Sequence, residues 1–390
     1  MPRKTFDFTF VFKITAILSL TLVYVAQWAT MIASPSLRTG TDFMAFYAAG
    51  RVAHLHGYSN TYNIDLQQEV QEGVVGFPLV QGQVLLYNHI PYLVPLLSSL
   101  VSADYVGSFL RWVALLFIIH TMAVVLLLGS IKNTSRSVLL FGNILFFPFF
   151  QSLLLGQDTS FLFLGVVLWV VGMTKKMDWM AGIGLALTSV RPHLCIVLAA
   201  PFLFYHRSVF WRFLAVVSVL VLISLLLLGK DGTFEFLTIL QISAGGTWHG
   251  MHETDMVNLI GLATRLFPFV QSDVIRAAGW IGYIAGIFLT VVLWQKEAPC
   301  TKKISASLIL ALFFAPHLHY HDLTLLLVPL ALLTWNDNRA AYLPLGISLL
   351  LLLLTPLYYV LPYVLYAGLA WLLVKRSSQL TGAMPPNPTG

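Results

Sequence analysis

The stretch SVLLFGNILFFPFFQSLLLGQDTSFLFLGVVLWVVGMT, residues 137–174, contains a single Asp, Glu, Lys or Arg side chain, Asp158. A helix needs about 20 apolar residues to cross a bilayer, and the segments on either side of the polar GQD approach that length. The whole chain is 58% hydrophobic and 10% charged, whereas roughly a quarter of residues are charged in soluble proteins. The alternating ten-residue segments of a β-barrel do not occur. The sequence therefore predicts an all-α polytopic membrane protein.

Apolar segments of this kind recur from one end of the chain to the other. We expect an uncleaved first helix at about 10–34, because its apolar core is longer than that of a signal peptide. Further segments lie near 89–103, 107–130, 138–153, 158–174, 179–205, 209–229, 277–295, 304–316, 320–335, 341–355 and 357–374. They predict a single domain, 1–375, with roughly 10–13 transmembrane helices.

Polar segments interrupt this pattern at three places. The loops 35–88 and 230–276 are hydrophilic, and the tail 376–390 contains Pro and Gly and is predicted to be disordered. Several half-segments, such as 179–190 and 193–205, are too short to cross a bilayer alone at 1.5 Å per residue. Broken helices are tolerated only inside protein or along a water-filled cavity. They therefore predict a cavity.

The basic residues predict the orientation. Lys and Arg gather in MPRK (1–4), KNTSR (132–136), TKK (174–176), 206–212, 295–303, 336–339 and KRSS (375–378). Because basic loops face the cytoplasm, we expect a cytoplasmic N-terminus in the cell membrane, with both polar loops outside. The segment 89–103 must then be a half-helix, since a full crossing would put KNTSR outside.

Charge and cysteine content exclude other classes. The net charge of +6 follows from cytoplasmic Lys and Arg and does not require a nucleic-acid partner. Cys195 and Cys300 are too few for a disulfide framework and are predicted to be free thiols. No phosphate-binding glycine loop, dinucleotide motif or paired-cysteine zinc spacing is present, and we expect no cofactor.

Asp42 is the first candidate for chemistry. It lies in GTDFMAFYAAGR, residues 40–51, directly after the first membrane helix. Thr41 or Asp42 suits the cap of a surface helix that presents Phe43, Phe46, Tyr47, Ala49 and Ala53 on one face. An exposed cap would explain the aspartate without any function, and both interpretations remain open on local sequence.

Arg191 is the second candidate, in the apolar run ALTSVRPHLCIVLAA, residues 186–200. Ionisable side chains at membrane depth are costly and mark functional sites, although Arg191 could also snorkel to the interface. Pro192 breaks the helix and places Arg191 and His193 beside the expected cavity. A guanidinium there is a good phosphate ligand.

The segment PHLHYHD, residues 316–322, contains three histidines. On a helix His317 and His321 would share a face while His319 points away, so a complete local metal site is not expected. Binding of an anionic substrate is the better interpretation.

Two further polar segments complete the set of binding residues. GGTWHGMHETD, residues 245–255, contains Trp248, His249 and His252, which suit a sugar ring, unless it is an ordinary loop. GQD contributes Gln157, unless it is a simple turn between helices.

Together these motifs resemble glycosyltransferase family 87 of the GT-C superfamily, whose members use polyprenyl-phosphate sugars. The resemblance rests on TDFMAFYAAGRVAHLHGYSNTYN (41–63), GQD, RPHL (191–194) and PHLHYHD, in family order. One departure is LLYNHIPYLVP (85–95), where relatives more often have a Tyr-Pro-Pro cluster. The resemblance implies a GT-C-type bundle with surface helices in the first external loop, and it aligns Asp42 with the family's catalytic aspartate.

The resemblance also implies a reaction. A hexose, usually mannose, would move from a polyprenyl-phosphate donor to a hydroxyl of a lipid or glycan acceptor with inversion, and Asp42 would act as general base. Tyr47, Gln157, Trp248, Arg191 and the histidines would bind the donor. Two alternatives remain: a transporter or flippase of lipid-linked sugars, and a non-catalytic membrane scaffold.

Overall fold

The computed structural model describes residues 8–38, 40–130, 136–244, 248, 253–334, 342–354 and 358–381. These residues form helices joined by short connections, with no strand among them. The α-helices are α1 (Phe8–Ala33), α2 (Pro35–Arg38), α3 (Phe43–His56), α4 (Ile64–Val75), α5 (Val94–Leu100), α6 (Tyr105–Gly129), α7 (Arg136–Ile144), α8 (Phe147–Leu155), α9 (Thr159–Thr174), α10 (Asp178–Leu187), α11 (Pro192–Phe204), α12 (Arg207–Ala244), α13 (Leu259–Leu266), α14 (Ser272–Gln295), α15 (Cys300–Phe314), α16 (Leu327–Thr334), α17 (Leu343–Leu353) and α18 (Leu361–Thr381). The chain is an all-α polytopic membrane protein, as predicted.

Four helices in the described part, α1, α6, α12 and α14, are each long and apolar enough to cross a bilayer. Shorter apolar helices of 10–17 residues fill the rest of the bundle, among them α9 and α11. The total of roughly 10–13 crossings stays a prediction, because several expected spans are divided. The segment 138–153, for instance, forms α7 and α8, with a break before Phe147.

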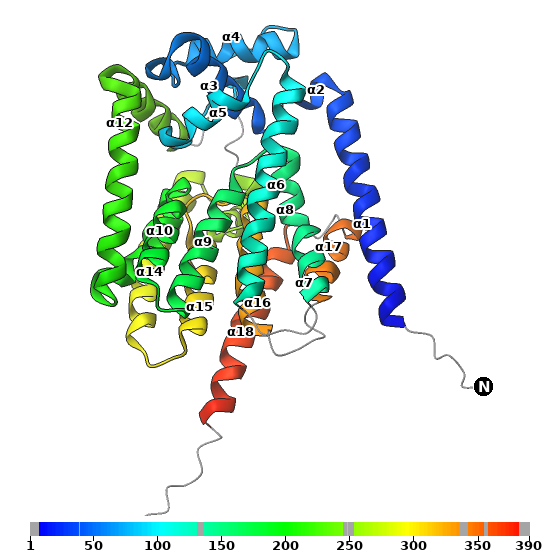
Figure 1. Ribbon diagram of the computed structural model, residues 1–390, viewed down its shortest axis with the longest axis vertical. Coiled ribbons are helices and arrows are strands. Elements are labelled where there is room, and N and C mark those ends of the chain that lie inside the picture. The colour runs from blue at the N-terminus through cyan, green and yellow to red at the C-terminus, as the bar shows by residue number, and fades with distance from the viewer. Residues whose placement is uncertain are drawn as a thin grey trace, which may run out of the picture.

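The helices form two layers (Figure 1). α3, α4 and α5 make a cap at one end, and the apolar helices run below it. α1 begins and α18 ends at the opposite end of the molecule. α5 with the preceding 3-10 turn covers only Pro91–Leu100, about 15 Å at 1.5 Å per residue, and it lies in the cap. The segment 89–103 thus contains only a short helix, and its failure to cross the bilayer stays a prediction.

Three expectations about the polar segments need correction. We predicted a surface helix after Asp42 with one apolar face, but every residue of α3 from Phe43 to Gly50 is buried, because α4, α5 and α6 surround it. The loop 230–276 begins as helix, since α12 continues past a kink at Gly229 to Ala244. α18 runs to Thr381 and so includes the start of the predicted disordered tail; residues 382–390 lie outside the described part.

Close helix packing depends on glycine at the α9–α10 contact. A Cβ at Gly184 would lie 2.2 Å from the backbone nitrogen of Trp169, and one at Gly172 would lie 2.3 Å from that of Ala181. Because lipid tails are as apolar as leucine, association in a bilayer depends on such close packing more than on hydrophobic burial. These glycines therefore hold α9 and α10 together.

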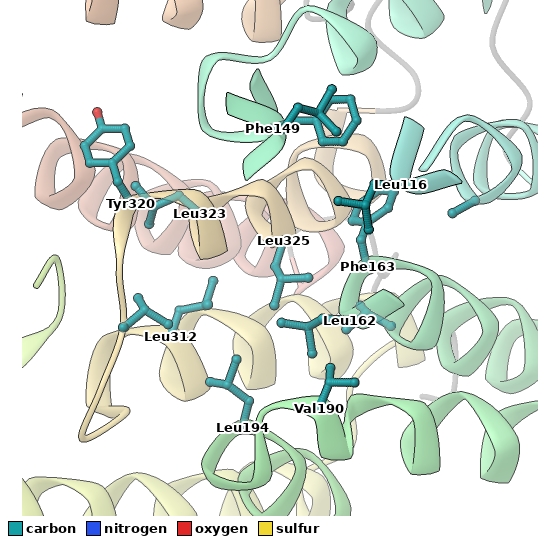
Figure 2. Close-up of a cluster of buried hydrophobic side chains, with 14 of the residues drawn as sticks. Leu116, Phe149, Leu162, Phe163, Val190, Leu194, Leu312, Tyr320, Leu323 and Leu325 are labelled. Atoms are coloured by element: carbon teal, nitrogen blue, oxygen red, sulfur yellow. The ribbon is translucent and has the colours of Figure 1, made fainter. Parts of the chain in front are cut away.

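A cluster of buried apolar side chains includes sequence neighbours of the polar breaks (Figure 2). Val190 and Leu194 flank Arg191 in sequence, and Leu323 follows Asp322; all three are buried. Leu162 from α9 and Leu312 from α15 belong to the same cluster. Charged side chains at this level are consequently surrounded by hydrocarbon and need partners within the protein.

Candidate active site

Asp42 occupies the position before the first residue of α3, but its side chain makes no cap hydrogen bond. The hydroxyl of Thr41 fixes this turn, because it donates to the carbonyl of Arg38 at 2.8 Å and lies 3.2 Å from the hydroxyl of Tyr105. The partly buried carboxylate of Asp42 instead accepts a hydrogen bond from Gln157 Nε2 at 2.7 Å. The interpretation of Asp42 as an ordinary exposed cap is therefore wrong.

The GQD turn reaches Asp42 because Gly156 adopts a left-handed conformation at the end of α8, with φ of 72°. The backbone NH of Gln157 donates to the carbonyl of Ser152 at 2.8 Å, and Trp112 Nε1 donates to the carbonyl of Gly156 at 2.7 Å. A Cβ at Gly156 would lie 2.6 Å from Cβ of Phe43. Glycine thus allows this turn to contact the start of α3 directly.

Arg191 lies at the break between the 3-10 turn Thr188–Val190 and α11, where Pro192 is the first helical residue. Its side chain is buried, with 8% of the residue exposed, so it does not snorkel to the interface. Its Nη2 donates to Gln157 Oε1 at 3.0 Å and its Nη1 lies 2.9 Å from Asp158 Oδ1. Its Nε lies 3.6 Å from Asp322 Oδ1. Arg191 thereby joins the GQD turn to the histidine segment.

Asp158 is fully buried and has a second partner in His89, whose Nδ1 lies 3.1 Å from Asp158 Oδ2. Burial alone would raise the pKa of Asp158, but Arg191 and then His89 outweigh it and hold this pKa well below its usual value. Phe46 packs on the ring of His89 at a centroid distance of 4.4 Å. Asp158 is thus an ionised carboxylate at the centre of the cluster.

The histidine segment is not α-helical. Residues 315–319 are an irregular connection, and a 3-10 helix follows at Tyr320–Leu326. The His319 ring lies between the other two, 4.6 Å from His317 and 5.8 Å from His321 between centroids. The orientation considered for an α-helix, with His319 pointing away, therefore does not apply to this segment.

The second polar segment supports this histidine row. Asn258 Nδ2 donates to the carbonyl of Ala315 at 2.7 Å. The backbone NH of Val257 donates to the carbonyl of Leu318 at 3.1 Å. His321 Nε2 lies 3.7 Å from Asp322 Oδ2. Burial, followed by the neighbouring histidines, lowers the pKa of His317 well below its usual value. His317 is neutral at pH 7 in this arrangement.

The other predicted binding residues that the structure describes have hydrogen-bond partners outside the ionic cluster. The hydroxyl of Tyr47 donates to the carbonyl of Ser102 at 2.9 Å, which ties it to the α5–α6 connection. His193 is partly buried in the first turn of α11, and its carbonyl accepts from Tyr283. Trp248 Nε1 donates to the carbonyl of Val84 at 2.7 Å. His249 and His252 lie outside the described residues.

Three residues of the cluster were not predicted as site residues: His89, Asp158 and Asp322. Asp158 and Asp322 are the acidic members of GQD and PHLHYHD, and a lone carboxylate in an apolar run is a signal that could have identified both. His89 has no comparable signal. Only its contacts with Asp158 and Arg191 assign it to the cluster.

The sequence profile described as glycosyltransferase family 87 matches residues 88–316, more than half of the 390-residue chain. The chain belongs to glycosyltransferase family 87. Comparison with curated proteins and with solved structures gives no match. Membership of family 87 identifies the chain as a membrane glycosyltransferase and confirms the resemblance inferred from its motifs.

The family 87 match includes Gln157, Asp158 and Arg191, and it ends before His317. Asp42 lies before its first residue. The structure nevertheless brings Asp42 into one hydrogen-bonded group with the matched residues. In this glycosyltransferase a partly exposed carboxylate is therefore fixed beside a buried ionic cluster, an arrangement that suits proton transfer from a bound hydroxyl.

Proposed function

We propose that the chain transfers a hexose from a polyprenyl-phosphate donor to a hydroxyl of a glycolipid or glycan acceptor at the external face of the cell membrane. Family membership supports sugar transfer, and the membrane helices suit a donor with a lipid tail. The observation that carries the proposal is the Asp42 carboxylate, bonded on one oxygen to Gln157 and only partly buried. Mannose is the proposed sugar, with an α-mannoside formed from a β-linked donor.

The proposed chemistry requires only one base. Glycosidases usually need a second carboxylic acid to protonate a poor leaving group, whereas a phosphate leaves readily. Asp42 accepts the proton of the acceptor hydroxyl as its oxygen bonds to the anomeric carbon. The bond from that carbon to the phosphate oxygen breaks on the opposite face, which inverts the configuration. The electron pair leaves with the phosphate.

The histidine row suits the departing phosphate. His317 and His319 are partly buried, and they are held in place through Asn258 and Val257. Imidazole N–H groups fixed beside the phosphate would stabilise the charge that develops on it. The lipid tail would lie between apolar helices, which explains why a sugar-transferring enzyme is mostly hydrophobic.

Asp42→Asn tests the proposal in purified protein supplied with a labelled polyprenyl-phosphate hexose and lipid acceptors. Wild type should transfer the label, and Asp42→Asn should lose about 10²- to 10⁴-fold in rate, the usual contribution of a general base. Asp65→Asn is the matched control, because Asp65 is an exposed aspartate in the first turn of α4 in the same cap. Full activity of Asp42→Asn would contradict the mechanism. Movement of labelled lipid across vesicles without transfer would support the transporter or flippase alternative.

A further inference from the structure

The guanidinium of Arg191 is directed at protein groups on all three of its nitrogens. Nε faces Asp322 at 3.6 Å. Nη1 faces Asp158 at 2.9 Å, His89 Nδ1 at 3.2 Å and the carbonyl of Val190 at 3.3 Å. Nη2 donates to Gln157 at 3.0 Å. Two buried carboxylates, Asp158 and Asp322, lie against its single positive charge. Arg191 is therefore poorly placed to bind the donor phosphate, which is the role its sequence context suggests.

Gln157 is buried as well, with 7% of the residue exposed, and both atoms of its amide are used. Its Oε1 accepts from Arg191, which donates only. The amide orientation is therefore fixed by the network, and Nε2 must face Asp42. A chain of contacts runs from Asp158 through Arg191 and Gln157 to the carboxylate of Asp42.

We propose that Asp158, Arg191 and Gln157 are positioning residues for Asp42, which hold its Oδ2 so that its other oxygen faces the acceptor hydroxyl. This inference rests on the proposed function and changes the role of Arg191 and Gln157 from donor binding to support of the base. Asp158 orients Arg191, Arg191 orients the amide, and the amide orients the carboxylate.

The neutral amide suits this role. A cation in direct contact with Asp42 would stabilise its charged form strongly and weaken it as a base. Gln157 instead gives one neutral hydrogen bond and keeps Arg191 one residue away. The other titratable groups close enough to interact electrostatically with Asp42 are His321 in the histidine segment and Tyr105 in α6. Loss of the amide should therefore change how transfer depends on pH, as well as its rate.

The test compares Gln157→Ala and Gln157→Glu with wild type and Asp42→Asn in the transfer assay. Gln157→Glu keeps the size of the side chain and the contact with Arg191, but it places a second carboxylate against Asp42. We expect kcat to fall about 10- to 100-fold in both variants, since misplacement by about 1 Å costs roughly 100-fold, with donor KM changed less than about threefold. The acid limb of the kcat profile should move to higher pH, further in Gln157→Glu, because the ionised base loses a donor or gains a like charge.

Gln71→Ala is the matched control for loss of a buried, doubly bonded glutamine. Both amide atoms of Gln71 bond to the backbone of Leu85, at 2.8 and 3.0 Å, away from Asp42. Gln71→Ala should lower the stability of the protein and leave the pH profile of transfer unchanged.

A donor KM raised more than tenfold at unchanged kcat in the Gln157 variants would overturn the proposal, because it would make Gln157 a donor ligand. A wild-type pH profile in Gln157→Glu would overturn it as well, even if Gln157→Ala does not fold. If Asp42→Asn abolishes transfer while the Gln157 variants keep the wild-type kcat and pH profile, the positioning role alone would be refuted. Absence of transfer by wild type would refute the proposed function and the positioning role together.

Discussion

Gly156→Ala should separate the two elements that bring Asp42 and Gln157 together. Gly156 has φ of 72° and ψ of 28°, and Gly76 at the end of α4 has nearly the same conformation, 80° and 14°. A Cβ at Gly156 would lie 2.6 Å from Cβ of Phe43, whereas no atom lies within 4 Å of a Cβ at Gly76. Gly76→Ala therefore isolates the cost of the left-handed backbone.

The expected magnitudes follow from these distances. A left-handed conformation costs an L residue roughly 1–2 kcal/mol, which is the whole effect at Gly76. Carbon atoms pack at about 3.5–4.0 Å, so the 2.6 Å approach at Gly156 requires a shift of about 1 Å. Such overpacking adds about 1–3 kcal/mol, and Gly156→Ala should lose about 2–5 kcal/mol in all. Phe43 follows Asp42 directly, so the same shift should lower kcat about 100-fold.

Unfolding in detergent measures the first effect, with the buried thiol of Cys195 as the reporter, and the sugar-transfer assay measures the second. Gly76→Ala should lose about 1–2 kcal/mol in unfolding free energy and keep wild-type kcat. Equal losses of stability in the two variants, with kcat preserved in both, would refute the inferred contact between the GQD turn and α3.

Two other perturbations test the ionic cluster and the helix packing. Asp158→Asn should lower the free energy of unfolding by about 1–3 kcal/mol at pH 7, because buried Arg191 loses one charged partner and keeps Asp322. The folded-state pKa of Asp158 is lowered, so its contribution is complete above the unfolded value of about 3.9 and is lost as pH falls towards the folded value. The difference from wild type should stay constant from pH 8 to about pH 5 and shrink below about pH 4; denaturation at a series of pH values checks this, and a difference that declines between pH 8 and 6 would contradict it. Gly184→Ala should lower stability by about 3 kcal/mol or prevent folding, since its Cβ would lie 2.2 Å from backbone, whereas Gly346→Ala in α17, with no atom within 4 Å, should be neutral or stabilising by up to about 1 kcal/mol. Comparable melting temperatures for these two glycine variants would contradict the close contact of α9 with α10.

The sequence by itself determined the class of the protein and the positions where its helices break. Composition decides whether a chain prefers lipid or water, so long uncharged runs were enough to predict an all-α membrane protein. Proline and polar residues interrupt helices locally, and the breaks at GQD and Arg191 appear where they were expected. A helix shorter than a full crossing at 89–103 could also be predicted, because the distribution of basic loops favoured it.

Only the tertiary structure decided which of these breaks meet. Asp42 and Gln157 are 115 positions apart in the chain, and no local pattern specifies that the amide of one faces the carboxylate of the other. α3 was misjudged for the same reason: its amphipathic spacing is local, whereas burial on every side comes from α4, α5 and α6. His89 belongs to the cluster through its contacts with Asp158 and Arg191, which depend on tertiary packing. Hydropathy and helix breaks are properties of single segments, but partner choice among buried charges depends on the close packing of helices that are distant in the sequence.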